Sequence, residues 1–126
     1  DGGSRGNPGK SACAYVICNQ SDEVIEDSGF YMGLATNNQA EYLGVQKALE
    51  RAQELGIDEV KLFSDSQLIV NQLKGVYKVK NVELAPYYQK VKSLSESFKS
   101  ISFTHIPREM NKLADQLVND TLDSLE

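Results

Sequence analysis

Apolar residues recur along the chain with two different periods, and these periods predict its secondary structure. Residues 11–19 and 23–32 are rich in strand-forming side chains, and the polar stretch 20–22 between them predicts a hairpin turn. Short apolar runs at 59–64 and 100–106 predict two further strands. The sheet should therefore begin with an antiparallel pair.

Four helices are expected around these strands. From Val45 to Leu55 the apolar residues keep helical spacing, Gly56 ends the helix, and residues 36–38 supply N-cap candidates. The other three helices are predicted at 66–73, 84–98 and 111–125. Because strands alternate with helices after the hairpin, the later strands should pair in parallel through right-handed crossovers. The pattern predicts an α/β fold of three layers, in which a mixed sheet carries helices on both faces.

Three segments between these elements are predicted to lack regular structure. Residues 1–10 hold four of the nine glycines and one of the three prolines, which is typical of a loop. Residues 74–81 form a lysine-rich loop between two helices, and residues 107–109 form a turn before the last helix.

Length and composition are those of one globular domain. The chain has 126 residues, 40% hydrophobic and 25% charged, and no apolar run approaches the ~20 residues of a membrane span. Cys13 and Cys18 would lie about 16 Å apart on one strand, at ~3.3 Å per residue, which is too far for a disulfide. A chain without disulfides is typical of the cytoplasm, and we expect a cytoplasmic monomer that does not associate with membranes.

The formal net charge of −5 narrows the possible functions. Eighteen acidic residues against thirteen basic ones repel polyanions, which argues against a protein that binds nucleic acid non-specifically. An enzyme whose acidic residues hold divalent cations is compatible with this charge, because the cations reverse the local field.

Four carboxylates stand where solvation alone would not place them. Glu41 lies four residues before Val45 and so shares the apolar face of its helix. Asp65 follows a predicted strand, and ligands of open α/β sheets usually bind at the carboxyl ends of strands. Asp115 lies near the start of the last helix, and Asp1 directly before the glycine-rich segment. Taken singly, each has a simpler interpretation as a helix cap, a dipole partner or a terminal residue.

Taken together, the four acids favour metal chemistry. Clustered carboxylates repel one another unless cations neutralise them, and ligands that are all oxygen suit Mg²⁺ or Mn²⁺. Two such ions ~3.5–4 Å apart activate a water and stabilise the leaving oxygen of a phosphodiester. The acids therefore point to metal-dependent phosphodiester hydrolysis.

Four segments of the chain match a family pattern in their order and separation. They are DGGSRGNPG at 1–9, TNNQAEY at 36–42, FSDSQLIV at 63–70 and PREMNKLAD at 107–115. On these segments the chain resembles type 1 ribonuclease H (ribonuclease HI), in the short bacterial and archaeal form whose loop after the third segment lacks a long basic insertion. The resemblance implies a ribonuclease H-like fold over residues 1–126, with a mixed five-stranded sheet, and hydrolysis of the RNA strand of RNA–DNA hybrids.

The resemblance also implies a role for each acid, in a site that holds two Mg²⁺ or Mn²⁺ ions when substrate is bound. Asp1 would bridge both ions, and Asp115 would help to hold the ion that activates water. Glu41 and Asp65 would hold the other ion. The products would carry a 5′-phosphate and a 3′-hydroxyl. Because relatives place the first aspartate inside a central strand, the resemblance further implies residues upstream of Asp1.

Other positions match family residues that contact the hybrid. Those expected to face the minor groove, where the 2′-hydroxyl distinguishes RNA from DNA, are Asn7, Asn37, Asn38 and Gln67, and Gly2 is a further expected substrate contact. Thr36 matches a contact to a phosphate of the DNA strand, and the DNA backbone is the expected partner of Lys74, Lys78 and Lys80. The simpler interpretations are a turn at Asn7, a helix cap at Asn37 or Asn38, and a solvated loop at the lysines.

Two residues before the last acid are candidates for an assisting role. His105 and Arg108 precede Asp115 by ten and seven residues. At these positions relatives carry a histidine or an arginine that assists proton transfer or product release. A histidine at a strand end is otherwise more often structural.

Three other functions stay open at this point. An integrase- or exonuclease-like nuclease on the same fold would cut all-DNA duplexes as well as hybrids. A non-catalytic hybrid-binding module is disfavoured, because a binder gains nothing from four clustered acids. A nucleotide-phosphate binder ranks last, because GGSRGNPG has neither the GxxxxGKS/T pattern nor the GxGxxG spacing.

Overall fold

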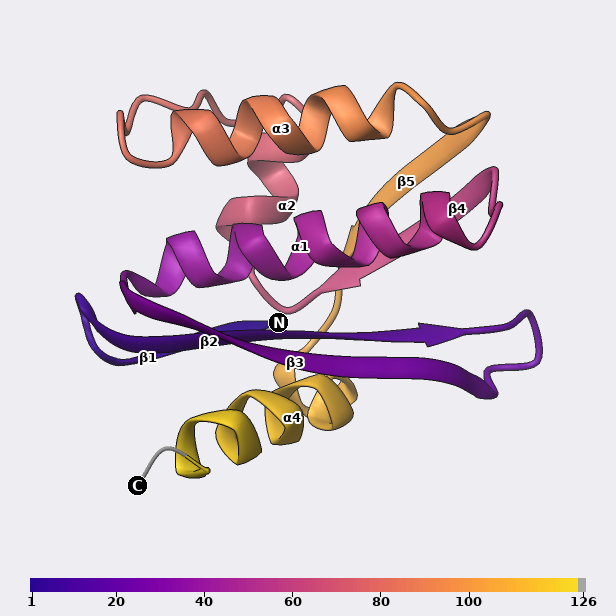
Figure 1. Cartoon of the computed structure of the whole chain (residues 1–126). Coiled ribbons are helices and arrows are strands. Elements are labelled where there is room, and N and C mark those ends of the chain that lie inside the picture. Colours follow the sequence, from indigo (N-terminus) through magenta and orange to yellow (C-terminus); the bar gives the residue numbers. More distant parts are fainter. Residues whose placement is uncertain (125–126) are drawn as a thin grey trace.

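The computed structural model describes residues 1–124, and Figure 1 shows how its elements are layered. The elements are β1 (Gly2–Gly6), β2 (Gly9–Cys18), β3 (Val24–Ala35), α1 (Asn37–Glu54), β4 (Glu59–Ser64), α2 (Gln67–Leu73), α3 (Ala85–Ser95), β5 (Ser100–His105), a 3₁₀ turn (Arg108–Met110) and α4 (Lys112–Asp123). Position 125, the predicted end of the last helix, lies outside the described residues. No helix among residues 1–124 is long and apolar enough to cross a membrane.

The second half of the chain follows the sequence prediction closely. The helices α2, α3 and α4 begin and end within three residues of the predicted ranges, and β4 has the predicted bounds. The strands β4 and β5 pair in parallel, from Glu59 opposite Ser100 to Ser64 opposite His105. Parallel pairing was expected because helices connect these strands, and it is confirmed.

The glycine-rich start of the chain is the main correction. Residues 1–10 were expected to form a loop, but Gly2–Gly6 forms strand β1, which pairs antiparallel with β2. Helix packing explains the glycine, because a Cβ on Gly2 would collide with the carbonyl carbon of Ala40 in α1. The strand therefore lacks side chains where the helix backbone lies directly against it.

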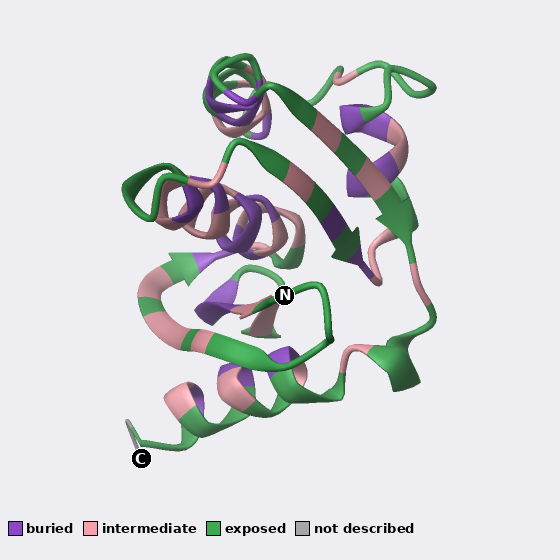
Figure 2. Ribbon diagram, turned by 90° about the vertical axis from the view of Figure 1, so that its right-hand side faces the viewer, coloured by how far each residue is buried: buried purple, intermediate pink, exposed green. Residues whose placement is uncertain are grey.

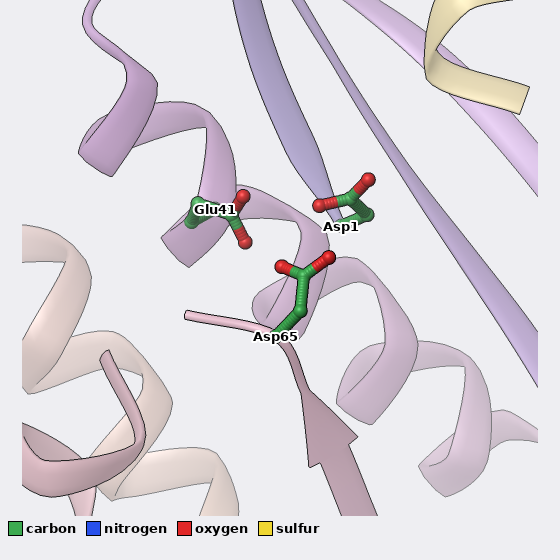
Figure 3. A group of neighbouring side chains, drawn as sticks. All are labelled: Asp1, Glu41 and Asp65. Atoms are coloured by element: carbon green, nitrogen blue, oxygen red, sulfur yellow. The ribbon is translucent and has the colours of Figure 1, made fainter. Parts of the chain in front are cut away.

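The sheet has five strands but is divided into two parts. In the described residues, β1, β2 and β3 form one antiparallel sheet, and β4 pairs only with β5. The resemblance implied five strands in one mixed sheet. The five strands are present, but β1 and β4 are not hydrogen-bonded to each other, and Asp1 before β1 lies beside Asp65 after β4 (Figure 3).

Helices cover both faces of the antiparallel sheet, as predicted. In Figure 1, α1 lies on one face of β2 and α4 on the other. Residues 11–15 of β2 are all buried, because each face is covered. On the α4 face, Ala12 and Ala14 pack against Val118 and Leu122.

A larger core lies between α1, α2, α3 and the β4–β5 pair. The buried sides of these helices face one another in Figure 2. Its largest fully buried side chains include Tyr42, Leu49, Ile69 and Val91. Within it, the Tyr42 hydroxyl donates a hydrogen bond to Gln72 Oε1 at 2.5 Å. This core fixes the direction of α1 and therefore the position of its first turns.

Candidate metal centre and substrate pocket

Three of the four predicted acids come together at one edge of the sheet. Asp1 lies directly before β1, Glu41 lies in α1, and Asp65 directly follows β4 (Figure 3). One carboxylate oxygen from each lies within 4.8 Å of the others, and all three residues are partly buried. Residues far apart in the sequence thus place three negative charges in one small volume.

Two glycines bring Glu41 and Asp1 together. Besides Gly2, described above, Gly44 in α1 allows a close approach, because a Cβ there would lie 2.5 Å from the carbonyl oxygen of Asp1. The Asp1 residue is held from the other side by β2, where its nitrogen donates to the Ala14 carbonyl at 2.7 Å. Backbone contact on both sides therefore fixes the first residue of the chain against the helix that carries Glu41.

The charge on Glu41 is poorly balanced by the protein. Burial, and to a smaller extent the nearby charge of Asp65, raise the pKa of Glu41 from 4.5 to about 7. A hydrogen bond from the Gly2 N–H and the charge of Arg108 act in the opposite direction but do not cancel the shift. A carboxylate in this condition is stabilised by any cation that reaches it.

Asp115 lies beside this group rather than in it. Within residues 1–124, the acids that gather closely enough to hold one ion are the three above. Asp115 sits in the first turn of α4, where its Oδ1 lies 3.5 Å from a guanidinium nitrogen of Arg108. The exposed Arg108 side chain therefore balances the fourth acid, and it also contributes to the field at Glu41.

A polar pocket of about 330 Å³ lies at the start of α1. The residues that line it are Asn7, Thr36, Asn37, Asn38, Asn81, Glu83 and Leu84. Four of these seven were predicted to contact substrate. The structure thus places residues from the β1–β2 turn, the start of α1 and the segment before α3 around one opening.

The hydrogen bonds in this pocket determine what it offers to a ligand. Thr36, not Asn37 or Asn38, is the N-cap of α1, and its hydroxyl oxygen accepts from the Gln39 N–H at 3.2 Å. Asn37 Oδ1 accepts from the Ser4 N–H at 2.8 Å, and Asn7 Oδ1 accepts from the Asn37 N–H at 3.1 Å. Since both carboxamide oxygens accept backbone hydrogen bonds, the amide N–H groups are the part of these side chains suited to a ligand.

Comparison with known proteins identifies the family. A family model described as reverse transcriptase-like matches residues 1–121. The curated ribonuclease HI of Halobacterium salinarum is 40% identical over 123 residues, which cover 98% of this chain and 62% of that protein. The crystal structure of RNase H1 from the same archaeon matches with a TM-score of 0.96, covering 98% of this chain and 94% of the solved one. The chain belongs to the ribonuclease HI family.

Two further proteins show a similar likeness to this chain. LC11-RNase H1, solved in complex with an RNA/DNA hybrid, matches with a TM-score of 0.94 at 41% identity, covering 99% of this chain and 94% of that one. The bifunctional protein Rv2228c of Mycobacterium tuberculosis is 39% identical over 125 residues, which are 98% of this chain and 34% of that protein. This chain therefore spans 62% of the length of the curated Halobacterium salinarum ribonuclease HI and 34% of the length of Rv2228c.

The remaining residues predicted from the ribonuclease HI resemblance lie around the acids and the pocket. His105, the exposed last residue of β5, is opposite Ser64 in the parallel pair and so lies at the strand ends that carry Asp65. Gln67 is exposed at the first residue of α2. The Gly2 N–H hydrogen-bonds to Glu41. None of these positions by itself establishes a substrate contact.

The lysine-rich loop at 74–81 (the lysine run) lines the polar pocket at one end and a second hollow at the other. Lys74, Lys78 and Lys80 are all exposed. The run leads directly to Asn81 in the polar pocket, while Lys74 lines a separate hollow of about 500 Å³ between the end of α2, α3 and β5. The lining of the larger hollow includes none of the four predicted acids, so its size alone does not mark it as the reaction site.

Three residues at the site were not predicted. Asn81 and Glu83 line the pocket, and the Asn111 side chain donates to Asp65 Oδ2 at 3.3 Å. The available signal was position: Asn81 ends the lysine run, and Asn111 lies inside the segment PREMNKLAD. Nothing in the spacing of apolar residues marks any of the three.

Proposed function

We propose that this ribonuclease HI family member is a metal-dependent endonuclease that cleaves the RNA strand of RNA–DNA hybrids. The observation that carries the proposal is the meeting of Asp1, Glu41 and Asp65 within 4.8 Å at the edge of the sheet. A protein that only binds hybrids would gain nothing from the mutual repulsion of three clustered carboxylates. The relative LC11-RNase H1 supports the substrate class, because it was solved in complex with an RNA/DNA hybrid.

The donor set suits small, hard cations. All of the gathered ligand atoms are carboxylate oxygens, and the raised pKa of Glu41 indicates negative charge that the protein leaves unbalanced. Asp1, Glu41 and Asp65 would hold Mg²⁺ or Mn²⁺, with Asp115 as the fourth candidate ligand. When bound, a pair of such ions activates a water and stabilises the leaving oxygen. The chain's own contribution is to hold these oxygens in place and to bind the hybrid beside them.

The polar pocket would read the minor groove of the hybrid. The amides of Asn7 and Asn37 present N–H donors, and the Thr36 hydroxyl can donate while its oxygen accepts from the helix. The minor groove presents acceptor atoms of the bases in RNA and DNA alike, and an RNA strand adds the 2′-hydroxyl oxygen as a further acceptor. A donor-rich pocket near the acids therefore favours a duplex with an RNA strand over B-form DNA.

The lysine run would contact the phosphate backbone of the DNA strand. Replacing Lys74, Lys78 and Lys80 by glutamine should flatten the dependence of hybrid affinity on salt, by up to ~0.9 in logarithmic slope for each lost phosphate contact. Hybrid affinity measured by fluorescence anisotropy at several salt concentrations tests this. An unchanged slope would show that the lysines form only a solvated loop.

The decisive experiment incubates the chain with a labelled hybrid, with and without Mg²⁺ or Mn²⁺, beside RNA-duplex and DNA-duplex controls. The expected result is metal-dependent cleavage of the RNA strand alone, leaving 5′-phosphate and 3′-hydroxyl ends. Cleavage of the DNA duplex would support the alternative of an integrase- or exonuclease-like nuclease. Tight hybrid binding without cleavage would support the alternative of a non-catalytic module.

The assisting role of His105 and Arg108 is tested by separate alanine variants. Arg108 contacts Asp115, so its loss should alter turnover more than the loss of His105, whose side chain has no comparable contact to an acid among the interactions described above. Turnover equal to wild type removes a residue from the mechanism. The cytoplasmic location and the monomeric state stay predictions.

A further inference from the structure

Asn111 stands between two of the acids. It lies directly before α4, and its side-chain Nδ2 donates to Asp65 Oδ2 at 3.3 Å, across 46 residues of sequence. Its backbone carbonyl accepts from the Asp115 N–H at 3.1 Å. The residue therefore contacts Asp65 through its side chain and Asp115 through its backbone.

The side chain of Asn111 is not used in the way that its position favours. Asparagine is among the best N-cap residues, because its side-chain oxygen accepts a hydrogen bond from the first turn of its own helix. Asn111 is the N-cap of α4, with φ −116° and ψ 30°, yet its side chain makes no such bond. Its amide donates to the carboxylate at the end of β4 instead. The local preference of the helix is replaced by a contact with the acid group.

We propose that Asn111 is a positioning residue of the metal site, which orients the Asp65 carboxylate and sets its separation from Asp115. This rests on the proposed function, since it concerns how carboxylates are held for divalent cations. A neutral amide suits this role, because it fixes one oxygen of Asp65 without a positive charge that would repel a cation. It also adds no negative charge to an already crowded group.

The test measures Mn²⁺ binding to the full chain, without nucleic acid, by isothermal titration calorimetry. Wild type is compared with Asn111→Ala and Asn111→Ser, and thermal unfolding of each is recorded in EDTA. Serine is a strong N-cap, so Asn111→Ser preserves the start of α4 while its shorter side chain loses the contact with Asp65. Asn119→Ala, at an exposed position on the same helix, is the matched control.

We expect both Asn111 variants to bind Mn²⁺ about tenfold more weakly, as is typical when a hydrogen-bond partner of a metal ligand is lost. Asn111→Ser should unfold at nearly the wild-type temperature, and hybrid turnover should fall in kcat with little change in KM. Asn119→Ala should match wild type throughout.

Two results would overturn the proposal. Wild-type Mn²⁺ affinity in both Asn111 variants would show that the contact does not position Asp65. Weaker binding in Asn111→Ala that serine restores would show a capping role only. If the wild-type chain neither binds Mn²⁺ nor cleaves the hybrid, the proposed function fails and this inference fails with it. If wild type does both and the variants are unchanged, only the inference fails.

Discussion

Two partly buried glutamates have opposite surroundings: Glu26 contacts α1 from strand β3, and Glu41 lies in α1 itself. Glu26 in β3 accepts from Arg51 Nε at 2.7 Å and from the Tyr15 hydroxyl at 2.8 Å, and these hydrogen bonds hold its pKa below the ordinary value. Glu41, near the other end of α1, has its pKa raised to about 7 by burial. The protein stabilises the charged form of Glu26 with its own hydrogen-bond donors, whereas the donors around Glu41 do not offset the cost of its burial.

The difference separates a structural ion pair from a candidate reaction site. The partners of Glu26 respond to it in turn: burial and the hydrogen bond with Glu26 raise the pKa of Tyr15 to about 12. The group is closed, and it ties β2, β3 and α1 together. Around Glu41 the nearest partners include two more acids. An arrangement that is unfavourable in the protein alone is favourable once a cation is present.

The largest expected effect comes from removing the unbalanced glutamate. Glu41→Gln should lower hybrid cleavage at least about a hundredfold, because the loss of a metal ligand should exceed the 10–100-fold effect typical of outer hydrogen-bond partners. The isosteric Glu26→Gln should stay within about twofold of wild type. Steady-state cleavage of a labelled hybrid in saturating Mg²⁺ measures both. Equal losses in the two variants would contradict the distinction between the two glutamates.

Glu41→Gln should also stabilise the folded chain when no metal is present. The folded protein holds the Glu41 proton more tightly than the unfolded chain, so its free energy of unfolding falls as pH rises from 4.5 to about 7. Glu41→Gln removes this loss and should be more stable than wild type at pH 8 in EDTA, by up to about 3 kcal/mol. The gain should vanish at pH 4. Urea denaturation at the two pH values measures it.

Added Mg²⁺ should reverse that order at pH 8, because binding stabilises only the chain that can hold the ion. A variant that is less stable than wild type in EDTA at pH 8 would contradict the account of Glu41 as an unbalanced charge.

A third prediction concerns the close contact that places Glu41 beside Asp1. Glycine to alanine inside a helix ordinarily stabilises a protein by about 1 kcal/mol. At Gly44 the added Cβ would lie 2.5 Å from the Asp1 carbonyl oxygen, so Gly44→Ala should destabilise the fold by about 1–3 kcal/mol and weaken Mn²⁺ binding. Gln46→Ala, in the same helix, is the control. A stabilised Gly44→Ala variant would show that the helix can move away without consequence.

The smallest effect is expected for the balanced glutamate. Because the pKa of Glu26 is lowered in the folded state, its ion pair contributes stability above the ordinary glutamate pKa, and the contribution is lost as pH falls through the lowered value. Glu26→Gln should therefore unfold at a slightly lower temperature than wild type at pH 7, with the difference disappearing in acid. Scanning calorimetry across this pH range detects it. A pH-independent difference would indicate lost packing instead.

The fold was predictable where local signals and tertiary contacts agree. The strand at 59–64 and the helices after it follow from apolar periodicity, and these elements pack as that periodicity requires. The first strand was not predictable in this way, because Gly2 is required by the close approach of α1 and not by a turn.

The site was predictable to the extent that its residues break a pattern. Glu41 interrupts an apolar helix face and Asp65 directly follows a strand, so both could be identified as unusual. The ion pair of Asp115 with Arg108 and the bond from Asn111 to Asp65 could not be. They depend on how the segment after β5 lies against the end of β4, and polar side chains on a surface turn give no periodic signal.

The helix α1 is a single rod of 18 residues that is fastened near both ends. The glycine contacts hold it near Glu41, and the Arg51 clamp holds it some ten residues, or about 15 Å, further along. A shift of α1 by one residue relative to the sheet would rotate every side chain by about 100° around the helix axis. The contacts at the two ends of α1 therefore fix together which of its sides faces the sheet, and the side that carries Glu41 faces Asp1 and Asp65.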